Sequence, residues 1–471
     1  MVFSSTVFLF VFLPVVYILY LLFKSIRVKN IILIAASLVF YAYGEPKAVL
    51  LMILSIIVNY FFGLGMAGKH KKPLLILSVI FNVLMLFVFK YLCFTADLLY
   101  SITGVNLHIP PIALPIGISF FTFQAMSYVI DVYKKPSLME KNILNIFLYI
   151  SLFPQLIAGP IIRFEDLAQE LESRQITAEK TAEGIRRFIF GLSKKMLIAN
   201  FMGMTADAAF NRDLGTLSAG ALWIGAAAYM FQIYYDFSGY SDMAVGLGKM
   251  FGFTFRENFN YPFSTGSMQD FWRRWNISVS TWFREYVYIP LGGNRKGKLR
   301  TNINKIIVFF LTGLWHGANL TFILWGLIHG AFLMLENYGI IGIVRSKRLP
   351  LRVLSHIYCL LVIMFTFVIF RADSIGQAFR YIGGMFTQSG GEYVSSSYVL
   401  SMVMTPYGIL VTLAAILFSV PTVPKLKEVF VQKGHALAGE YLAGVVSLVL
   451  LGMCIMSLMT ASYNPFIYFR F

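Results

Sequence analysis

The sequence predicts an all-α polytopic integral membrane protein, and two observations support this prediction. Of its 471 residues, 58% are hydrophobic, 16% are aromatic and only 13% are charged, whereas about 25% of the residues in an ordinary soluble domain are charged. Apolar stretches also recur along nearly the whole chain, although the core of a soluble domain stops growing at about 250–300 residues. The bilayer must therefore be the solvent for most of this chain. We expect a single integral membrane domain over residues 1–471.

About eleven stretches approach the ~20 apolar residues that a membrane-spanning helix needs. They lie at about Val7–Phe23, Ile31–Tyr43, Val49–Met66, Pro73–Phe94, Ile112–Val132, Leu144–Ile162, Ile306–Leu314, Leu320–Leu335, Leu354–Phe370, Ile409–Val420 and Leu442–Leu458. Several are short enough to be re-entrant segments rather than complete spans. We therefore expect about eleven transmembrane helices together with re-entrant and amphipathic segments.

The formal net charge of +17 indicates a topology signal and contacts with lipid headgroups rather than nucleic-acid binding, because Lys and Arg gather in short loops. Basic residues follow the first, third and fifth apolar stretches: Lys24, Arg27 and Lys29, then Lys69, Lys71 and Lys72, then Lys134 and Lys135. Cytoplasmic loops carry an excess of such residues. This pattern predicts that these loops are cytoplasmic and that Met1 lies outside.

The segment from Phe255 to Arg300 is rich in Arg, Asn, Trp and Tyr, and none of its windows is long and apolar enough to span the membrane. Its large apolar side chains recur at steps of three or four residues, which is the spacing of one helical face. They are Phe271, Trp275, Val279, Trp282 and Tyr286. We predict an interfacial or membrane-embedded amphipathic helix here, with its aromatic residues at the level of the headgroups.

Among six histidines, His316 follows an apolar run directly, so we expect it at membrane depth, where a titratable side chain is costly and a functional role is the first hypothesis. A buried histidine that hydrogen-bonds to a backbone carbonyl is the structural alternative, and position alone favours neither. His329 also lies in an apolar run, but Gly317 can break the helix between the two. We expect His329 to pack. No Cys, Asp or Glu stands at ligand spacing from either, so no metal site is expected.

Residues 232–242 (QIYYDFSGYSD) place Gln232, Asp236 and Asp242 between apolar flanks. Buried carboxylates need partners, and we expect these among the guanidinium groups of Arg273, Arg274 and Arg284. Such pairs can fix the fold or take part in catalysis, and the structural interpretation is favoured.

Several longer motifs stand in a fixed order along the chain. Residues 271–295 read FWRRWNISVSTWFREYVYIPLGGNR and residues 313–317 read GLWHG. These motifs resemble the membrane-bound O-acyltransferase family. Together with residues 114–124 (LPIGISFFTFQ), 153–160 (FPQLIAGP) and 235–244 (YDFSGYSDMA), they are similar to the bacterial polysaccharide O-acetyltransferases typified by AlgI. The motif core extends from about residue 114 to residue 330.

The resemblance implies a compact bundle of transmembrane helices with a reaction centre inside the membrane. The characteristic histidine of the family falls on His316, and its second characteristic position falls on Asn276, where bacterial relatives usually carry His. Around them we expect further residues that bind the donor or support the site: Trp275, Arg273, Arg274, Trp282, Arg284, Trp315, Asp236 and Gln232. A neutral imidazole suits a general base at neutral pH, and the Asn276 amide can stabilise an oxyanion or orient the imidazole.

The resemblance further implies a multi-pass bacterial plasma-membrane protein that passes acetyl groups from a cytoplasmic thioester, acetyl-CoA, toward an extracytoplasmic polysaccharide such as an alginate-like exopolysaccharide, cellulose or peptidoglycan. An SGNH-type acetyltransferase partner, secreted or tethered to the membrane, is expected to complete the transfer. A positively lined cytoplasmic mouth would suit the phosphates of coenzyme A, and the candidates for it, which can also be topology signals only, are Arg295, Lys296, Lys298 and Arg300. The alternatives are a DltB-like D-alanyl transferase for teichoic acid, a proton-coupled transporter and a structural platform for a secretion complex.

Overall fold

The computed structural model of the chain describes residues 1–346, 348–388, 393–460 and 463–467. Helices form its regular structure, and no β-strand occurs within those ranges, which confirms the all-α prediction. The chain divides into two compact units, one formed by Met1–Phe188 with Ser241–Arg256 and the other by Ile189–Tyr240 with Glu257–Phe471. The expectation of a single domain over 1–471 stays a prediction.

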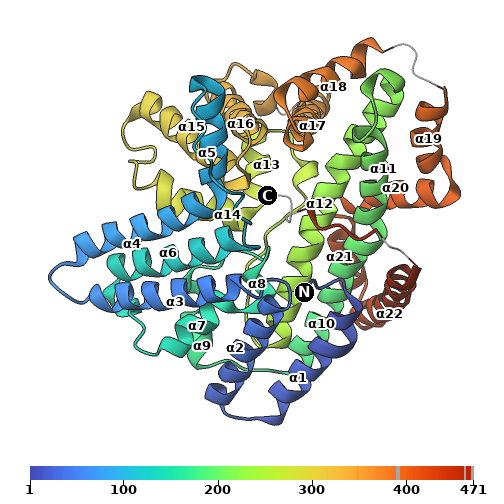
Figure 1. Ribbon diagram of the computed structural model, residues 1–471. Coiled ribbons are helices and arrows are strands. Elements are labelled where there is room, and N and C mark those ends of the chain that lie inside the picture. The colour runs from blue at the N-terminus through green and yellow to red at the C-terminus, as the bar shows by residue number, and fades with distance from the viewer. Residues whose placement is uncertain (347, 389–392, 461–462, 468–471) are drawn as a thin grey trace. The chain divides into compact units, whose positions relative to one another are not determined.

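The first unit contains the N-terminal helices (Figure 1). Their bounds are η1 Phe8–Phe12, α1 Leu13–Leu22, α2 Ile26–Ala42, α3 Ala48–Gly65, α4 Lys71–Leu86, η2 Phe87–Tyr91, α5 Leu92–Thr103, α6 Ile118–Lys134, η3 Pro136–Leu138, α7 Ile143–Ser151, α8 Phe153–Leu156, α9 Phe164–Glu172 and the first part of α10, Ala178–Ser193. Large buried side chains such as Phe8, Phe40 and Phe153 fill its interior with aromatic ring contacts.

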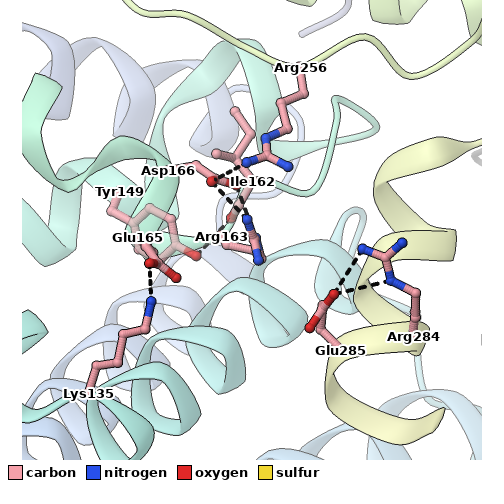
Figure 2. Close-up of polar contacts among 9 residues, drawn as sticks. All are labelled: Lys135, Tyr149, Ile162, Arg163, Glu165, Asp166, Arg256, Arg284 and Glu285. Carbon is pink, nitrogen blue, oxygen red and sulfur yellow. Dashed lines mark hydrogen bonds and ion pairs between the residues drawn. The ribbon is translucent and has the colours of Figure 1, made fainter. Parts of the chain in front are cut away.

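Ion pairs gather around α9 in the first unit (Figure 2). The Asp166 carboxylate accepts hydrogen bonds from Nε and Nη2 of Arg163, at 3.1 and 2.9 Å, and from Nη2 of Arg256 at 2.6 Å. Glu165 pairs with Lys135 at the end of α6. The acidic first turn of α9 therefore carries both carboxylates, where the helix dipole also favours negative charge.

The second unit contains the remaining helices. Their bounds are η4 Lys194–Ala199, α11 Asn200–Phe210, η5 Leu214–Thr216, α12 Ala219–Met250, η6 Pro262–Ser264, α13 Met268–Arg274, α14 Ile277–Phe283, η7 Arg284–Tyr288, α15 Gly297–His316, α16 Leu320–Tyr338, η8 Gly342–Arg345, α17 Leu349–Arg371, α18 Ile375–Thr387, α19 Tyr393–Met404, α20 Pro406–Phe418, α21 Thr422–Gln432 and α22 Ala436–Thr460. The last ten residues of α12 belong to the first unit. All the predicted site residues belong to this second unit.

Five described helical segments are long and apolar enough to cross a membrane, or six if the bent pair Ser395–Met404 and Pro406–Phe418 is one span. The five are α3, the run from α4 to α5 (Lys71–Thr103), α16, α17 and α22. This supports a multi-pass protein, but the predicted number of about eleven spans is not confirmed. One reason is that predicted stretches are broken: Leu144–Ile162 divides at Leu152, whose φ of −53° and ψ of 112° are not helical, just before Pro154.

The sequence prediction also assigned no helix to residues 219–250, which form α12, a helix of 32 residues. Its polar side chains Gln232, Asp236, Ser238 and Ser241 are buried, and they lowered the local hydropathy enough to hide the helix. The predicted continuous amphipathic helix over Phe271–Tyr286 is wrong in one respect, because it divides at Trp275 and Asn276 into α13 and α14. Four of its five aromatic and apolar side chains are nevertheless buried, as the spacing predicted.

Candidate functional site

His316 is the last residue of α15, and the predicted break after it is confirmed. Gly317 has an extended backbone with φ 178°. Helix α16 begins three residues later, where Oδ1 of Asn319 accepts a hydrogen bond from the N–H of Thr321 at 3.0 Å. A side-chain oxygen at this position satisfies a backbone donor that the first helical turn leaves unpaired. The two helices therefore form a hairpin with His316 at its turn.

Aromatic rings surround the His316 imidazole, which is 7% exposed. Its centroid lies 4.8 Å from the ring of Trp315, 5.0 Å from that of Trp325 on α16 and 5.0 Å from that of Phe370 on α17. The last two contacts are edge-to-face, an arrangement that attracts aromatic rings to one another. Three helices thus fix the orientation of this ring.

Two glycines let α15 and α16 approach closely next to His316. A Cβ atom at Gly313 would lie 2.4 Å from the carbonyl oxygen of Phe322, and one at Gly326 would lie 2.2 Å from that of Phe309. Since both obstructing atoms belong to the backbone, neither position has room for a side chain. Small residues permit close helix packing in membranes, and here they place Trp325 against the imidazole.

His329 lies one turn beyond Trp325 on α16 and is fully buried. Its Nδ1 accepts a hydrogen bond from Nε1 of Trp272 on α13 at 3.3 Å, and its ring lies 4.7 Å from that of Trp325. These contacts are consistent with the packing role that we expected.

Asn276 joins α13 to α14 and is 2% exposed. Its backbone is left-handed, with φ 43° and ψ 56°, a conformation that Asn tolerates better than most residues. The neighbouring segment holds this junction, because Asn258 accepts hydrogen bonds from the N–H groups of Ile277 and Ser278, both at 2.9 Å. Oδ1 of Asn276 has no hydrogen-bond partner among the described residues. The side chain therefore retains hydrogen-bonding capacity inside the protein.

Ring contacts connect this junction to His316. Trp275 lies 5.4 Å from Phe367 on α17, Phe367 lies 6.4 Å from Phe370, and Phe370 contacts the imidazole. These four side chains are all aromatic, and all are buried. Trp275, the residue before Asn276, therefore belongs to the same aromatic cluster as His316.

The predicted arginines lie away from the buried rings. Arg274 pairs with Asp270 in its own helix at 3.2 Å, and Nη2 of Arg284 with Oε1 of Glu285 at 2.9 Å (Figure 2). Arg273 is exposed. Trp282 is buried against Phe283 and Tyr286, with ring centroids 5.3 and 5.2 Å apart. These residues contact α13, α14 and η7 rather than the rings around His316.

The prediction that Asp236 and Asp242 pair with arginines of residues 273–284 is wrong. Asp236 pairs with Lys195 at 2.7 Å, and both side chains are at most 4% exposed. Asp242, which belongs to the first unit, accepts a hydrogen bond from Nε of Arg187 at 2.9 Å. Arg274 and Arg284 are instead engaged by carboxylates one to four residues away. Asp236 and Asp242 thus each pair with a cation on a helix other than α13, α14 and η7.

The C-terminal segment completes the surroundings of Asp236. Oδ2 of Asp236 accepts a hydrogen bond from the N–H of Ile467 at 2.8 Å, and Lys195 donates to the carbonyl of Pro465. The Gln232 amide is buried and packs over Gly203, where a Cβ would lie 2.6 Å from its Nε2. Lys195 and Arg371, which binds Asp207, were not predicted from the sequence. The signal available for both was a basic residue next to an apolar run, residues 196–199 for Lys195 and residues 362–370 for Arg371.

The comparisons with known proteins identify the family of the chain. Residues 137–375, just over half of the chain, match the model of the membrane-bound O-acyltransferase family. The chain belongs to this family. It is 39% identical to the probable alginate O-acetylase AlgI of Azotobacter vinelandii, with all of both chains covered. It is 32% identical to the peptidoglycan O-acetyltransferase of Helicobacter pylori, over 83% of this chain and 80% of the relative.

This acyltransferase also resembles the teichoic acid D-alanyltransferase of Bacillus subtilis, at 31% identity over 43% of this chain and 53% of that protein. The family match includes His316, Asn276, Trp325 and Phe370. The family and its relatives show that the protein is a multi-pass membrane O-acyltransferase of the AlgI-like branch. This assignment replaces the transporter and platform alternatives.

Proposed function

We propose that the protein transfers acetyl groups from acetyl-CoA in the cytoplasm toward hydroxyl groups of an extracytoplasmic polysaccharide, and that it does so in the bacterial plasma membrane. The observation that carries this proposal is the full-length similarity to alginate O-acetylases, combined with a buried histidine at the family position and held by rings from three helices.

His316 is the general base in this proposal. A ring nitrogen accepts the proton of the acceptor hydroxyl as its oxygen attacks the thioester carbonyl carbon. The carbon–sulfur bond then breaks, the thiolate of coenzyme A takes the proton from the imidazolium, and an ester remains. The aromatic rings around His316 exclude water, which would otherwise compete as an acceptor.

Asn276 stabilises the thioester carbonyl oxygen, on which negative charge develops in the tetrahedral intermediate. Its buried amide can donate a hydrogen bond from Nδ2, and its Oδ1 is not engaged by another described residue. Such a donor typically contributes about 10²–10³ in rate. The alternative role, orienting the imidazole, uses the same amide and the same aromatic cluster.

The donor's phosphates would meet the basic run at the start of α15, where Arg295, Lys296, Lys298 and Arg300 are exposed. His316 ends the same helix, about 28 Å away along its axis at 1.5 Å per residue. The basic run would thus bind the nucleotide end of acetyl-CoA while the thioester extends toward His316. An SGNH-type partner, outside the membrane or tethered to it, would pass the acetyl group to the polysaccharide.

D-alanyl transfer to teichoic acid is the weaker candidate, since that similarity covers 43% of this chain, against 100% for the alginate O-acetylase of Azotobacter vinelandii.

The test uses membrane vesicles that contain the full chain, with acetyl-CoA labelled in its acetyl group. Label should accumulate in a polysaccharide or in a partner protein, and His316→Ala should abolish this while the chain still inserts and accumulates, because general-base catalysis contributes about 10²–10⁴. Normal labelling by a well-folded His316→Ala variant would falsify the catalytic assignment. Transfer of D-alanine but not of acetyl would favour the weaker candidate, D-alanyl transfer to teichoic acid.

A further inference from the structure

A buried carboxylate that the mechanism does not use lies on α16. Glu336 is 4% exposed, in a helix long and apolar enough to span the membrane. A charged side chain there is costly, and it is retained where it binds specific groups. Oε1 of Glu336 accepts a hydrogen bond from the N–H of Met268 at 2.7 Å, and Oε2 accepts one from the N–H of Gln269 at 3.0 Å. Glu336 therefore binds the beginning of α13.

Each of the first four backbone N–H groups of α13 donates a hydrogen bond to a described acceptor. Glu336 accepts from the first two, Oγ of Ser267 accepts from Asp270 at 3.1 Å, and the carbonyl of Ser267 accepts from Phe271 at 3.0 Å. A carboxylate also complements the positive end of the helix dipole. The hydroxyl of Tyr358 on α17 donates to Oε1 of Glu336 at 3.2 Å and steadies the carboxylate.

The same face of α16 carries the other contacts of the site. Trp325, His329 and Glu336 stand at positions i, i+4 and i+11, within about 40° of one another around the helix at 100° per residue. Trp325 contacts His316, His329 accepts a hydrogen bond from Trp272 in the middle of α13, and Glu336 binds the first turn of α13. One face of α16 therefore contacts both His316 and α13, the helix that precedes Asn276.

We propose that Glu336 is a positioning residue for acyl transfer: by binding the N-terminus of α13 it fixes the position of the α13–α14 junction, and thereby Asn276, relative to His316. This inference rests on the proposed function. Helix α13 has seven residues, too few to be stable without tertiary contacts, so its position depends on what binds its ends. Asn258 and Asn260 hold the far end, where Asn260 donates to the carbonyl of Arg274 at 2.9 Å.

The test compares Glu336→Gln with the unchanged chain in vesicles supplied with labelled acetyl-CoA. A glutamine offers one oxygen and an NH₂ group, so it cannot give each backbone N–H group an oxygen of its own, as the carboxylate does, and it removes the negative charge at the helix N-terminus. The rate at saturating acetyl-CoA, per mole of folded chain, should fall about 10- to 100-fold, the loss that a small misplacement of a reacting group causes. The half-saturating concentration of acetyl-CoA should not change, because the donor's binding contacts are intact.

A matched control is Ser374→Ala, which removes the cap of α18, where Oγ of Ser374 accepts from the N–H of Gln377 at 3.2 Å. It should leave the saturating rate unchanged.

The decisive measurement repeats Glu336→Gln in an Asn276→Gly background. If Glu336 acts through Asn276, its loss should then lower the rate by about threefold or less, since coupled residues are not additive. An equal loss in both backgrounds, a rise confined to the half-saturating concentration, or a loss confined to protein yield would each overturn the inference.

If Glu336→Gln does not accumulate, the test uses Ser267→Ala instead. This variant removes a cap from the same end of α13, and the Ser267 side chain is only partly buried. It should lower the saturating rate by less than about 10-fold, and this loss should disappear in the Asn276→Gly background. The two proposals fail separately. A fully active His316→Ala variant overturns the proposed function, whereas an inactive His316→Ala variant beside a fully active, well-folded Glu336→Gln variant overturns only the role of Glu336.

Discussion

The indole N–H of Trp272 donates a hydrogen bond to Nδ1 of His329, with 3.3 Å between the two nitrogens. Since Nδ1 accepts, the proton of this neutral imidazole must lie on Nε2. The bond connects α13 to α16 in the same aromatic cluster as His316. This bond gives His329 a structural role.

We expect His329→Ala to lower protein stability more than catalysis. The substitution removes a fully buried ring and leaves the Trp272 N–H unpaired, at a cost of about 1–3 kcal/mol for the lost acceptor. Acetyl transfer per folded molecule should exceed that of His316→Ala by at least about tenfold, given the 10²–10⁴ that a general base contributes. Measuring folded protein by size-exclusion chromatography alongside label transfer separates the two effects. Equal losses of specific activity in both variants would contradict this assignment.

The glycine contact between α15 and α16 predicts that Gly326→Ala impairs activity although alanine favours helices. The added Cβ would lie 2.2 Å from the carbonyl oxygen of Phe309, so the helices must separate and Trp325 must move away from His316. Overpacking of this kind costs about 1–3 kcal/mol. The control is Gly444→Ala in α22, which meets no atom within 4 Å and should stabilise its helix by up to about 1 kcal/mol. Thermal unfolding and label transfer should both separate the variants; unchanged activity in Gly326→Ala would show that the close approach is not required.

The buried pair of Lys195 and Asp236 predicts an asymmetry between single and double substitutions. Lys195→Met leaves a carboxylate uncompensated and should destabilise the protein by about 3–5 kcal/mol. Lys195→Met with Asp236→Asn removes both charges and keeps an oxygen that can accept from the N–H of Ile467, so most of the stability should return. Thermal unfolding in detergent measures both. If the double variant were as unstable as Lys195→Met, the pair would have a role beyond mutual neutralisation.

The sequence predicted the helix break after His316 and the buried aromatic face around Trp275 better than it predicted the number and bounds of the helices. His316, Gly317 and the aromatic face around Trp275 follow from an apolar run, a helix breaker and a periodicity, which are local properties of the chain. The pairing of Asp236 with Lys195 could not be predicted in this way, because it depends on which helices meet in space. The contact of Glu336 with α13 could not be predicted for the same reason. Its charge within an apolar helix indicates only that the side chain needs a partner.

The number of spans was the least predictable feature. Hydropathy detects helices that face lipid, whereas α12 buries polar residues against other helices and therefore has no strong apolar window. The division at Asn276 was equally hidden, because only its φ of 43° shows that the periodic face belongs to two helices.

The alternating basic loops predict that Lys69–Lys72 and Lys134–Lys135 are cytoplasmic and that Met1 is outside. Lys71 begins α4, and Lys134 ends α6. A Lys71→Cys variant should not react with a membrane-impermeant thiol reagent in intact cells, and it should react after permeabilisation. Since the chain contains Cys93, Cys359 and Cys454, the background is a variant in which all three are replaced by Ser or Ala. Strong labelling in intact cells would reverse the topology.

Asn276 should assist catalysis without being indispensable, and its backbone decides which substitution tests this. Because φ is 43°, Asn276→Ala would add backbone strain of about 1–2 kcal/mol to the loss of the amide. Asn276→Gly removes the amide without that strain, so it should fold like the unchanged chain while the rate of acetyl transfer falls by about 10²–10³. Asn276→His should retain more activity than the Gly and Ala variants, because His also adopts the left-handed conformation more readily than most residues and its ring can donate a hydrogen bond. The saturating rate with labelled acetyl-CoA, per folded molecule, measures all three. Rates near that of the unchanged chain in both Asn276→Gly and Asn276→His would show that the side chain has no part in the chemistry, and that the constraint on this position is the backbone turn between α13 and α14.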